Sequence, residues 1–157
     1  MRAARGFTLI ELVITVAILG VLATMALPML QMTAQREKEA ELRAGLREIR
    51  GAIDAYHQAV IDKKILVAQD AAGYPPDLDS LVNGVPDATR PDNRPLYFLR
   101  RLPRDPFYPD ASVAASETWG KRSYASPPDN PSEGEDVFDV FSLSEKTGLN
   151  GVAHREW

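Results

Sequence analysis

Hydrophobic and polar positions divide the chain into an apolar stretch and a charged remainder. Residues 12–30 carry no charged side chain, whereas charged residues are frequent after Gln31. A helix from Phe7 to Leu30 would extend about 36 Å, which is enough to cross a bilayer. The pattern therefore predicts a transmembrane helix over residues 7–30.

Residues 31–60 continue the helical period with an amphipathic pattern. Apolar side chains recur three and four positions apart and form one stripe: Leu42, Leu46, Ile49, Ile53, Tyr56 and Val60. The other faces carry charges that can pair three or four positions apart, which is typical of a solvated helix face. We expect one long helix over residues 7–60. We also expect a kink or melted turn near residues 24–28, because Pro28 lacks an N–H donor and clashes with the preceding turn.

The region after residue 60 is rich in proline. Eleven of the 12 prolines lie between Pro75 and Pro131, which predicts short elements joined by ordered loops. We expect a short helix over residues 77–82 and strands over Arg122–Ala125 and Val137–Leu143. In the second strand, alternation divides the side chains between a face with Phe138, Val140 and Ser142 and a face with Val137, Asp139, Phe141 and Leu143. The predicted fold is α+β, with a small antiparallel sheet packed on the apolar stripe of the helix.

Charge and cysteine content narrow the function classes. The net charge is −4, and residues 31–157 hold 16 basic against 21 acidic side chains, which argues against non-specific nucleic-acid binding. The absence of cysteine excludes disulfides, thiolate zinc sites and cysteine nucleophiles. Arg2 and Arg5 precede the apolar run, so the N-terminus should stay in the cytoplasm while residues 31–157 lie across the membrane.

Glu11 is the one acidic residue of the apolar segment. A carboxylate inside a transmembrane helix costs about 2.5–3.5 kcal/mol on the insertion scale. Glu11 either lies near the interface and reaches water or meets a cation supplied by another chain. A cleaved signal peptide is the further alternative for the segment, but the apolar run is longer than the core of such a peptide.

Residues 5–12 read Arg-Gly-Phe-Thr-Leu-Ile-Glu-Leu and resemble the cleavage and methylation signature of type IV pilins and type II secretion pseudopilins. The resemblance implies that residues 1–6 are a cytoplasmic leader. A prepilin peptidase would remove this leader after Gly6 and N-methylate Phe7.

The same resemblance assigns roles in filament assembly. It implies that Glu11 pairs with the N-terminal amine of a neighbouring subunit, which would supply the cation considered above. The family's helix-breaking glycine and proline fall on Gly20 and Pro28, between which the helix loosens in assembled filaments. The implied fold is the type IV pilin-like fold, with residues 31–157 as the periplasmic domain: an amphipathic helix over 31–60 and a loop and sheet region over 61–157.

A second resemblance covers the rest of the chain. Short motifs follow one another as in the major pseudopilins of type II secretion systems: Tyr74-Pro75-Pro76, residues 101–106 (RLPRDP), Trp119-Gly120, Tyr124 and residues 138–143 (FDVFSL). The segment between Asp110 and Trp119 departs from that family, which has a tight Asp-Pro-Trp-Gly run there.

These relatives bind calcium in a loop after the last strand, through aspartates and backbone carbonyls. The corresponding residues 144–151 contain one acid, Glu145, followed by Lys146, which repels cations. Calcium prefers six to eight oxygen ligands. Glu145, supplemented by carboxylates of residues 129–139, is therefore the candidate calcium ligand. The alternative is a loop held by its own packing with Trp157 as an anchor, and no other cofactor is expected.

The sequence contains no catalytic motif. GxxxxGK, GxGxxG and GxSxG are all absent, and the two histidines, His57 and His154, are far apart in the sequence and are expected to be surface or capping residues. The arginines of residues 90–104 form a basic stretch for which we expect an acidic patch on the next subunit as partner. DNA binding is the alternative, which the acidic domain disfavours.

The sequence is thus identified with a non-enzymatic, structural class. The resemblance implies a subunit of a type II secretion pseudopilus in the bacterial inner membrane. Its partners would be copies of itself, prepilin peptidase, other pseudopilins and the inner-membrane assembly platform. The alternatives are a type IV pilus subunit for adhesion, motility or DNA uptake and a monomeric membrane-anchored binding protein. The sequence specifies neither the exported substrate nor a major or minor position in the filament.

Overall fold

The computed structural model describes residues 7–92 and 94–157, except for the side chains of residues 25–28. By its internal contacts the chain divides into two units, residues 1–37 and 38–157. Helix α1 (Leu9–Ile61) begins in the first unit and ends in the second. The predicted long helix is confirmed, and its assignment is continuous through residues 24–28. The predicted kink falls on residues 24–28, and the side chains of residues 25–28 are not among those that the structure describes, so the kink stays a prediction.

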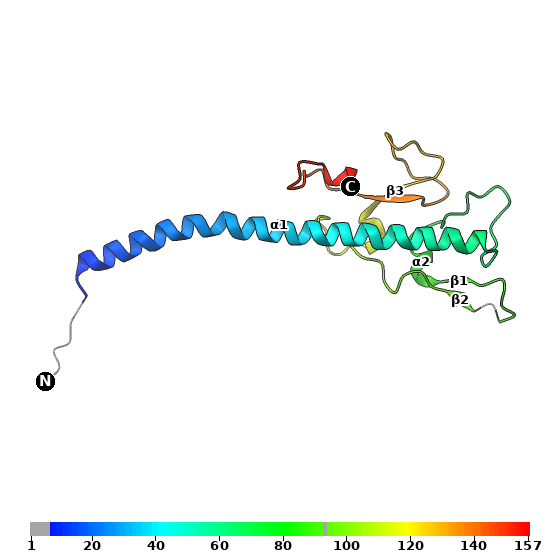
Figure 1. The fold of residues 1–157 in the computed structure, drawn as a ribbon, viewed down its shortest axis with the longest axis horizontal. Coiled ribbons are helices and arrows are strands. Elements are labelled where there is room, and N and C mark those ends of the chain that lie inside the picture. The colour runs from blue at the N-terminus through cyan, green and yellow to red at the C-terminus, as the bar shows by residue number, and fades with distance from the viewer. Residues whose placement is uncertain (1–6, 93) are drawn as a thin grey trace. The chain divides into compact units, whose positions relative to one another are not determined.

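The second unit adds short elements around the last turns of α1 (Figure 1). They are α2 (Ser80–Asn83), β1 (Val85–Pro86), β2 (Pro95–Leu96), the 3-10 helix η1 (Ala115–Glu117), β3 (Trp119–Arg122), β4 (Asp139–Ser142) and the 3-10 helix η2 (His154–Glu156). β3 pairs with β4 in antiparallel register, Trp119 opposite Ser142 and Arg122 opposite Asp139. β1 and β2 form a second antiparallel pair. The predicted α+β, pilin-like architecture is confirmed.

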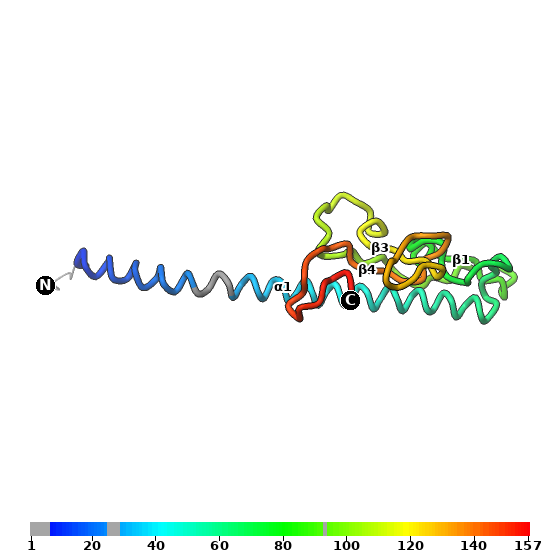
Figure 2. Tube along the Cα trace, turned by 90° about the horizontal axis from the view of Figure 1, so that it is seen from above, coloured from blue at the N-terminus to red at the C-terminus, as the bar shows by residue number. Residues whose placement is uncertain are grey.

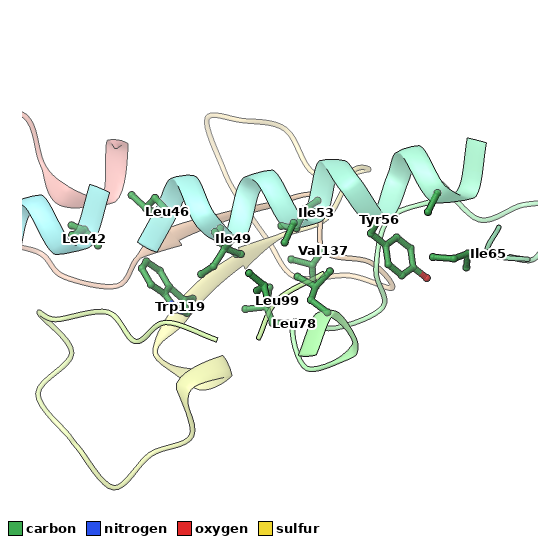
Figure 3. Close-up of a cluster of buried hydrophobic side chains, with 14 residues drawn as sticks. Leu42, Leu46, Ile49, Ile53, Tyr56, Ile65, Leu78, Leu99, Trp119 and Val137 are labelled. Atoms are coloured by element: carbon green, nitrogen blue, oxygen red, sulfur yellow. The ribbon is translucent and has the colours of Figure 1, made fainter. Parts of the chain in front are cut away.

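The core lies along the predicted stripe of α1 (Figure 3). Leu42, Leu46, Ile49, Ile53 and Tyr56 are buried, and Val60 packs against them. The opposing side chains come from the loops and short elements: Ile65, Leu78, Leu81, Leu99, Trp119, Val137 and Val140. Fourteen hydrophobic side chains are buried in this cluster, so α1, α2, β3 and β4 share one core.

Trp119 explains a glycine that weakens the helix. Its side chain is 1% exposed, and its indole N–H donates to the Pro103 carbonyl at 2.8 Å. A Cβ at Gly45 would lie 3.3 Å from the indole ring. The helix therefore accepts a loss of up to about 1 kcal/mol at Gly45 so that the tryptophan can lie against its backbone.

The predicted strand over Arg122–Ala125 is wrong in position. The strand is β3, Trp119–Arg122, and the chain turns after it, with the Ser126 N–H donating to the Ser123 carbonyl. The sequence pattern does not predict a strand at Gly120, because glycine weakens strands and has no side chain to pack. Here the ring of Phe141, opposite Gly120, occupies the space that a Cβ would need.

The other element predictions are close to the structure. β4 lies inside the predicted Val137–Leu143 segment, and its buried face carries Val140 and Ser142 as the alternation requires. The helix predicted over residues 77–82 is α2, displaced toward Ser80–Asn83. The β1–β2 pair was not predicted, since each strand has only two residues and contains a proline.

Candidate functional site

The first turn of α1 is organised by two threonines. The Thr8 hydroxyl oxygen accepts the N–H of Glu11 at 3.3 Å, as an N-cap side chain does. The Thr15 hydroxyl lies 3.0 Å from the Glu11 carbonyl and 2.8 Å from the Leu12 carbonyl. The backbone around Glu11 is thereby satisfied within the chain, and its side chain is left to point outward.

The first unit exposes apolar side chains along its helix. Phe7 is 82% exposed. More than half of the side-chain surface is also exposed at ten further apolar residues: Leu9, Ile10, Leu12, Val13, Ile14, Val16, Ile18, Leu19, Val21 and Leu22. By length and composition α1 is able to cross a membrane. An apolar surface of this extent requires lipid or other chains to cover it.

The predicted assembly residues lie in this surface. Glu11 is exposed, and within the described residues its carboxylate has no hydrogen-bond or ion-pair partner. Gly20 is also exposed, and a Cβ at this position would meet no other described side chain within 4 Å. Gly6 lies outside the described residues, and so does the side chain of Pro28. The roles of all five processing and assembly residues, Phe7 included, stay predictions.

The candidate calcium loop is held by protein groups. Glu145 is exposed, and the described part of the chain contains no group of three histidine, aspartate or glutamate side chains that could hold a metal ion. The loop is closed by a bridge between Thr147 and Ala153 and by the Gly148 N–H, which donates to the Val152 carbonyl at 2.9 Å. The part of the loop that is described offers Glu145 no second carboxylate with which to share a cation. The calcium role of Glu145 stays a prediction.

A buried carboxylate on α1 also binds this loop. Glu39 is 3% exposed, and its Oε1 accepts the N–H of Leu149 at 2.8 Å. The same oxygen lies 3.8 Å from His154 Nε2. On its other side, Glu39 Oε2 is 3.8 Å from an Arg43 guanidinium nitrogen.

The expectation that His154 is a surface or capping residue is wrong, because this side chain is fully buried. Its ring lies 4.1 Å from the ring of Phe107 and 4.8 Å from that of Trp157. Nδ1 is 3.3 Å from the Ser144 hydroxyl. The imidazole packs between these aromatic rings, where the loop meets the helix. The sequence alone does not reveal this position.

Arg50 on α1 forms hydrogen bonds with β4 and with the C-terminal residue. Its guanidinium donates to Asp139 Oδ1 at 2.7 Å, to the Val140 carbonyl at 3.0 Å and to the main-chain oxygen of Trp157 at 2.8 Å. Arg43 lies over the Trp157 ring, 4.1 Å from its centroid. Residues 140–157 accordingly run along α1 within the second unit (Figure 2), with Trp157 as the anchor that the sequence suggested.

The pKa values of Asp87 and Tyr74 differ from the ordinary values of these groups. Hydrogen bonds from the Thr89 hydroxyl and N–H lower the pKa of Asp87, and Arg90 contributes less. Burial raises the pKa of Tyr74, followed in effect by Tyr124 and by the carboxylates of Asp54 and Asp136. The carboxylates of Asp54 and Asp136 are thus close enough to Tyr74 to disfavour its ionised form.

The sequence reasoning missed Glu39 and Arg50, which it assigned to solvated faces of the helix. A signal was present for Glu39. It precedes Leu42 by three positions and so continues the three-and-four spacing of the apolar stripe. A carboxylate in register with a buried stripe indicates a hydrogen-bond partner within the fold, here the N–H of Leu149.

The N-terminal segment matches a known protein family. Residues 1–27 match the family model for the prokaryotic N-terminal methylation motif. Together with the uncovered apolar helix and the small antiparallel sheets, this match confirms the resemblance to pilin-like proteins.

Three named proteins are similar to longer parts of the chain. The chain is 27% identical to the type II secretion system core protein G of Klebsiella pneumoniae, over 93% of this chain and 100% of that protein. It is 27% identical to the protein of the same name from Vibrio cholerae, over 91% of this chain and 82% of that protein. A fimbrial protein of Pseudomonas aeruginosa is 37% identical, but over only 43% of this chain and 42% of its own length. No solved structure matches the chain.

Proposed function

We propose that the protein is a structural subunit of a type II secretion pseudopilus. The observation that carries the proposal is the methylation motif over residues 1–27 on a helix whose described apolar side chains from Phe7 to Leu22 are all exposed. Relatives named type II secretion system core protein G match nearly the whole chain. The fimbrial relatives match less than half of it, so a type IV pilus subunit is the less supported alternative.

The proposed cycle begins in the inner membrane. The apolar part of α1 spans the bilayer once, with Arg2 and Arg5 on the cytoplasmic side and the second unit in the periplasm. Prepilin peptidase cleaves between Gly6 and Phe7 and methylates the new amine on Phe7. Processing thus creates a cationic group at the end of a helix that carries a carboxylate only four residues further on.

Glu11 then directs assembly. A lone carboxylate in the apolar segment is unfavourable by about 2.5–3.5 kcal/mol, and pairing with the amine of a neighbouring subunit offsets part of this cost. Each added subunit brings both groups, so the pairing repeats along a filament. Other pseudopilins and the inner-membrane assembly platform are the remaining partners in this proposal.

The filament acts mechanically. Subunits added at its base lengthen it into the periplasm, and its advance moves exported proteins toward the outer membrane. The protein itself carries out no chemical reaction, takes no nucleic acid as partner and requires no cofactor for this role. A membrane-anchored monomer is disfavoured, because it would leave Glu11 without a cation in the bilayer.

Processing is tested by co-expression with a prepilin peptidase. The intact mass should fall by residues 1–6 and rise by one methyl group, and Gly6→Val should block both changes because the peptidase must approach the backbone at this site. Cleavage near Ala26 in place of Gly6 would identify an ordinary signal peptide and refute the proposal.

Assembly is tested with Glu11→Ala in the secreting host. This variant should insert into the membrane at least as well as the natural chain, since a charge is removed from lipid, and should lose filament formation and secretion. Thr8→Ala, which removes only the capping oxygen near Glu11, is the matched control and should retain both. Normal filaments from Glu11→Ala would rule out the pairing role.

A further inference from the structure

The second unit carries an aromatic pocket that the proposed function does not explain. It has a volume of about 770 Å³ and lies between the loop that follows α1 and the loop after β3. Tyr74 and Tyr124 form its aromatic wall, their rings stacked at 5.5 Å between centroids. The Tyr124 side chain is 60% exposed. The Tyr74 ring is also stacked on His57, with 4.3 Å between centroids, so the exposed Tyr124 ring is the flat aromatic surface that a ligand can reach from outside.

The rim of the pocket is acidic. Asp70, Glu135 and Asp136 all line it, and Asp70 and Glu135 are exposed. Within the described residues, neither Asp70 nor Glu135 has an ion-pair or hydrogen-bond partner. Asp136 is engaged structurally, because its Oδ1 accepts the N–H of Tyr124 at 2.8 Å.

Aromatic faces combined with carboxylates recognise one kind of group. A guanidinium stacks on a tyrosine ring while its N–H groups bond to a carboxylate. The raised pKa of Tyr74, due mainly to burial and in part to nearby anions, agrees with an electronegative surface that attracts cations. The pocket thus fits an arginine side chain.

The chain itself presents such arginines on a separate surface. Arg47, Arg100 and Arg101 are exposed and line a groove of about 700 Å³ together with Phe98 and Leu99. Glu48 lines the same groove. In the described part of the chain none of the three arginines has an ion-pair or hydrogen-bond partner.

Most of the other arginines of the second unit are already engaged. Arg43, Arg50, Arg90 and Arg122 each contact a carboxylate of the chain, Arg104 donates to the carbonyls of Val113 and Asp110, and Arg155 lies over the Phe141 ring. The unpaired arginines are therefore concentrated at the groove, apart from Arg94. This surplus of positive charge matches the surplus of negative charge at the pocket.

The two surfaces share no lining residue, so one copy can use both at once. A contact that joins two different surfaces of identical chains is heterologous, and repetition of it generates an open helical array. We propose that the Tyr74–Tyr124 pocket of one copy receives Arg100 and Arg101 of a neighbouring copy. This inference rests on the proposed function, to which it adds a contact between the periplasmic units.

Charge reversal and its compensation test the contact in the full-length chain. The first variant is Arg100→Glu with Arg101→Glu, and the second is Asp70→Lys with Glu135→Lys. Each should lower filament yield and secretion by at least about tenfold, because attraction is replaced by repulsion at every repeat. The four-substitution combination restores opposite charges and should recover filaments to within about threefold of the natural chain.

Two controls match these changes at exposed positions outside both surfaces. Lys63→Glu and Glu156→Lys alter charge by the same sign and should leave filaments unchanged, since both residues are exposed and line neither surface. Neutral Arg100→Gln with Arg101→Gln should weaken assembly less than the reversal does. Purified variants should keep the melting temperature of the natural chain, since none of the altered side chains is buried.

The outcomes separate this contact from the proposed function. If the natural chain is processed and forms filaments that depend on Glu11 while both reversals are silent, the contact is overturned and the function stands. Failure of the combination to recover would also overturn it, because the arginines would then bind a different partner. If the natural chain forms no filament, both proposals fall.

Discussion

Replacement of Glu39 by alanine should destabilise the second unit. The variant removes the buried carboxylate that accepts the N–H of Leu149, and the loss of this charge-assisted bond costs about 1.5–3 kcal/mol. Loss of the buried side-chain methylenes adds about 1 kcal/mol. The expected loss of unfolding free energy is roughly 3 kcal/mol, or about 10 °C in melting temperature for a unit of this size.

The matched control is Glu39→Gln. An amide oxygen can still accept the Leu149 N–H, and the attraction lost to Arg43 is worth about 0.5 kcal/mol at a partly exposed pair. The relief of carboxylate desolvation works in the opposite direction, so this variant should remain within about 1 kcal/mol of the natural chain.

Thermal and urea unfolding of a chain starting at Gln31 give both free energies. Equal effects of Glu39→Ala and Glu39→Gln would mean that charge, and not the hydrogen bond, holds the loop. A change of less than about 2 °C for Glu39→Ala would refute the reasoning altogether.

Other positions yield further predictions. Calcium and chelator should give the same melting curve, and Trp157→Ala should cost about 2 kcal/mol whereas Glu145→Ala costs under about 0.5 kcal/mol; a calcium-dependent increase that Glu145→Ala abolishes would contradict this. Gly120→Ala should destabilise by about 1–3 kcal/mol, because a Cβ there overlaps the aromatic ring of the facing strand. Gly51→Ala is its control: its Cβ meets nothing, so helix propensity should make it neutral or stabilising, and urea titration distinguishes the two. The pKa of Asp87 lies below its ordinary value in the folded chain, so its contribution is present above pH about 4 and is lost as the pH falls through the folded pKa. Urea denaturation of Asp87→Asn should therefore show a smaller loss of stability between neutral and acidic pH, and parallel curves for the two chains would exclude this contribution.

Periodicity predicted the parts of the fold that depend on one element at a time. The stripe from Leu42 to Val60 is the helix side of the core, since a helix buries whichever face is apolar. The alternation in residues 137–143 likewise put Val140 and Ser142 on one face, and both are buried. Such patterns are local, and the sequence displays them directly.

Contacts between distant elements were less predictable. The strand at Trp119 was displaced in the prediction because Gly120 has no side chain to signal a strand, and the space beside it is filled by the ring of Phe141 on the facing strand. His154 was assigned to the surface, although it is buried against Phe107 and beside Glu39. In each case the reason lies in a partner far away in the chain, which propensity and spacing do not record.

The same was true of the candidate site. The residues of the methylation motif form one local signature, and its resemblance was recognisable in the sequence. The acidic pocket joins residues from Tyr56 to Asp136, and only folding brings them together. The basic stretch was noticed in the sequence, but which of its arginines remain unpaired follows from the structure alone.

Arg50 has a consequence for the order of events during synthesis. Its hydrogen-bond partners lie 89, 90 and 107 residues later in the chain. A ribosome therefore completes the apolar stripe of α1 long before it makes the residues that cover that stripe. Long-range closure is slow, and exposed apolar surface promotes aggregation. If the second unit is exported as proposed, it crosses the membrane before its helix is covered. Translation stopped before residue 139 should yield a chain that is bound by chaperones or degraded, even though its apolar helical segment and methylation motif are already complete.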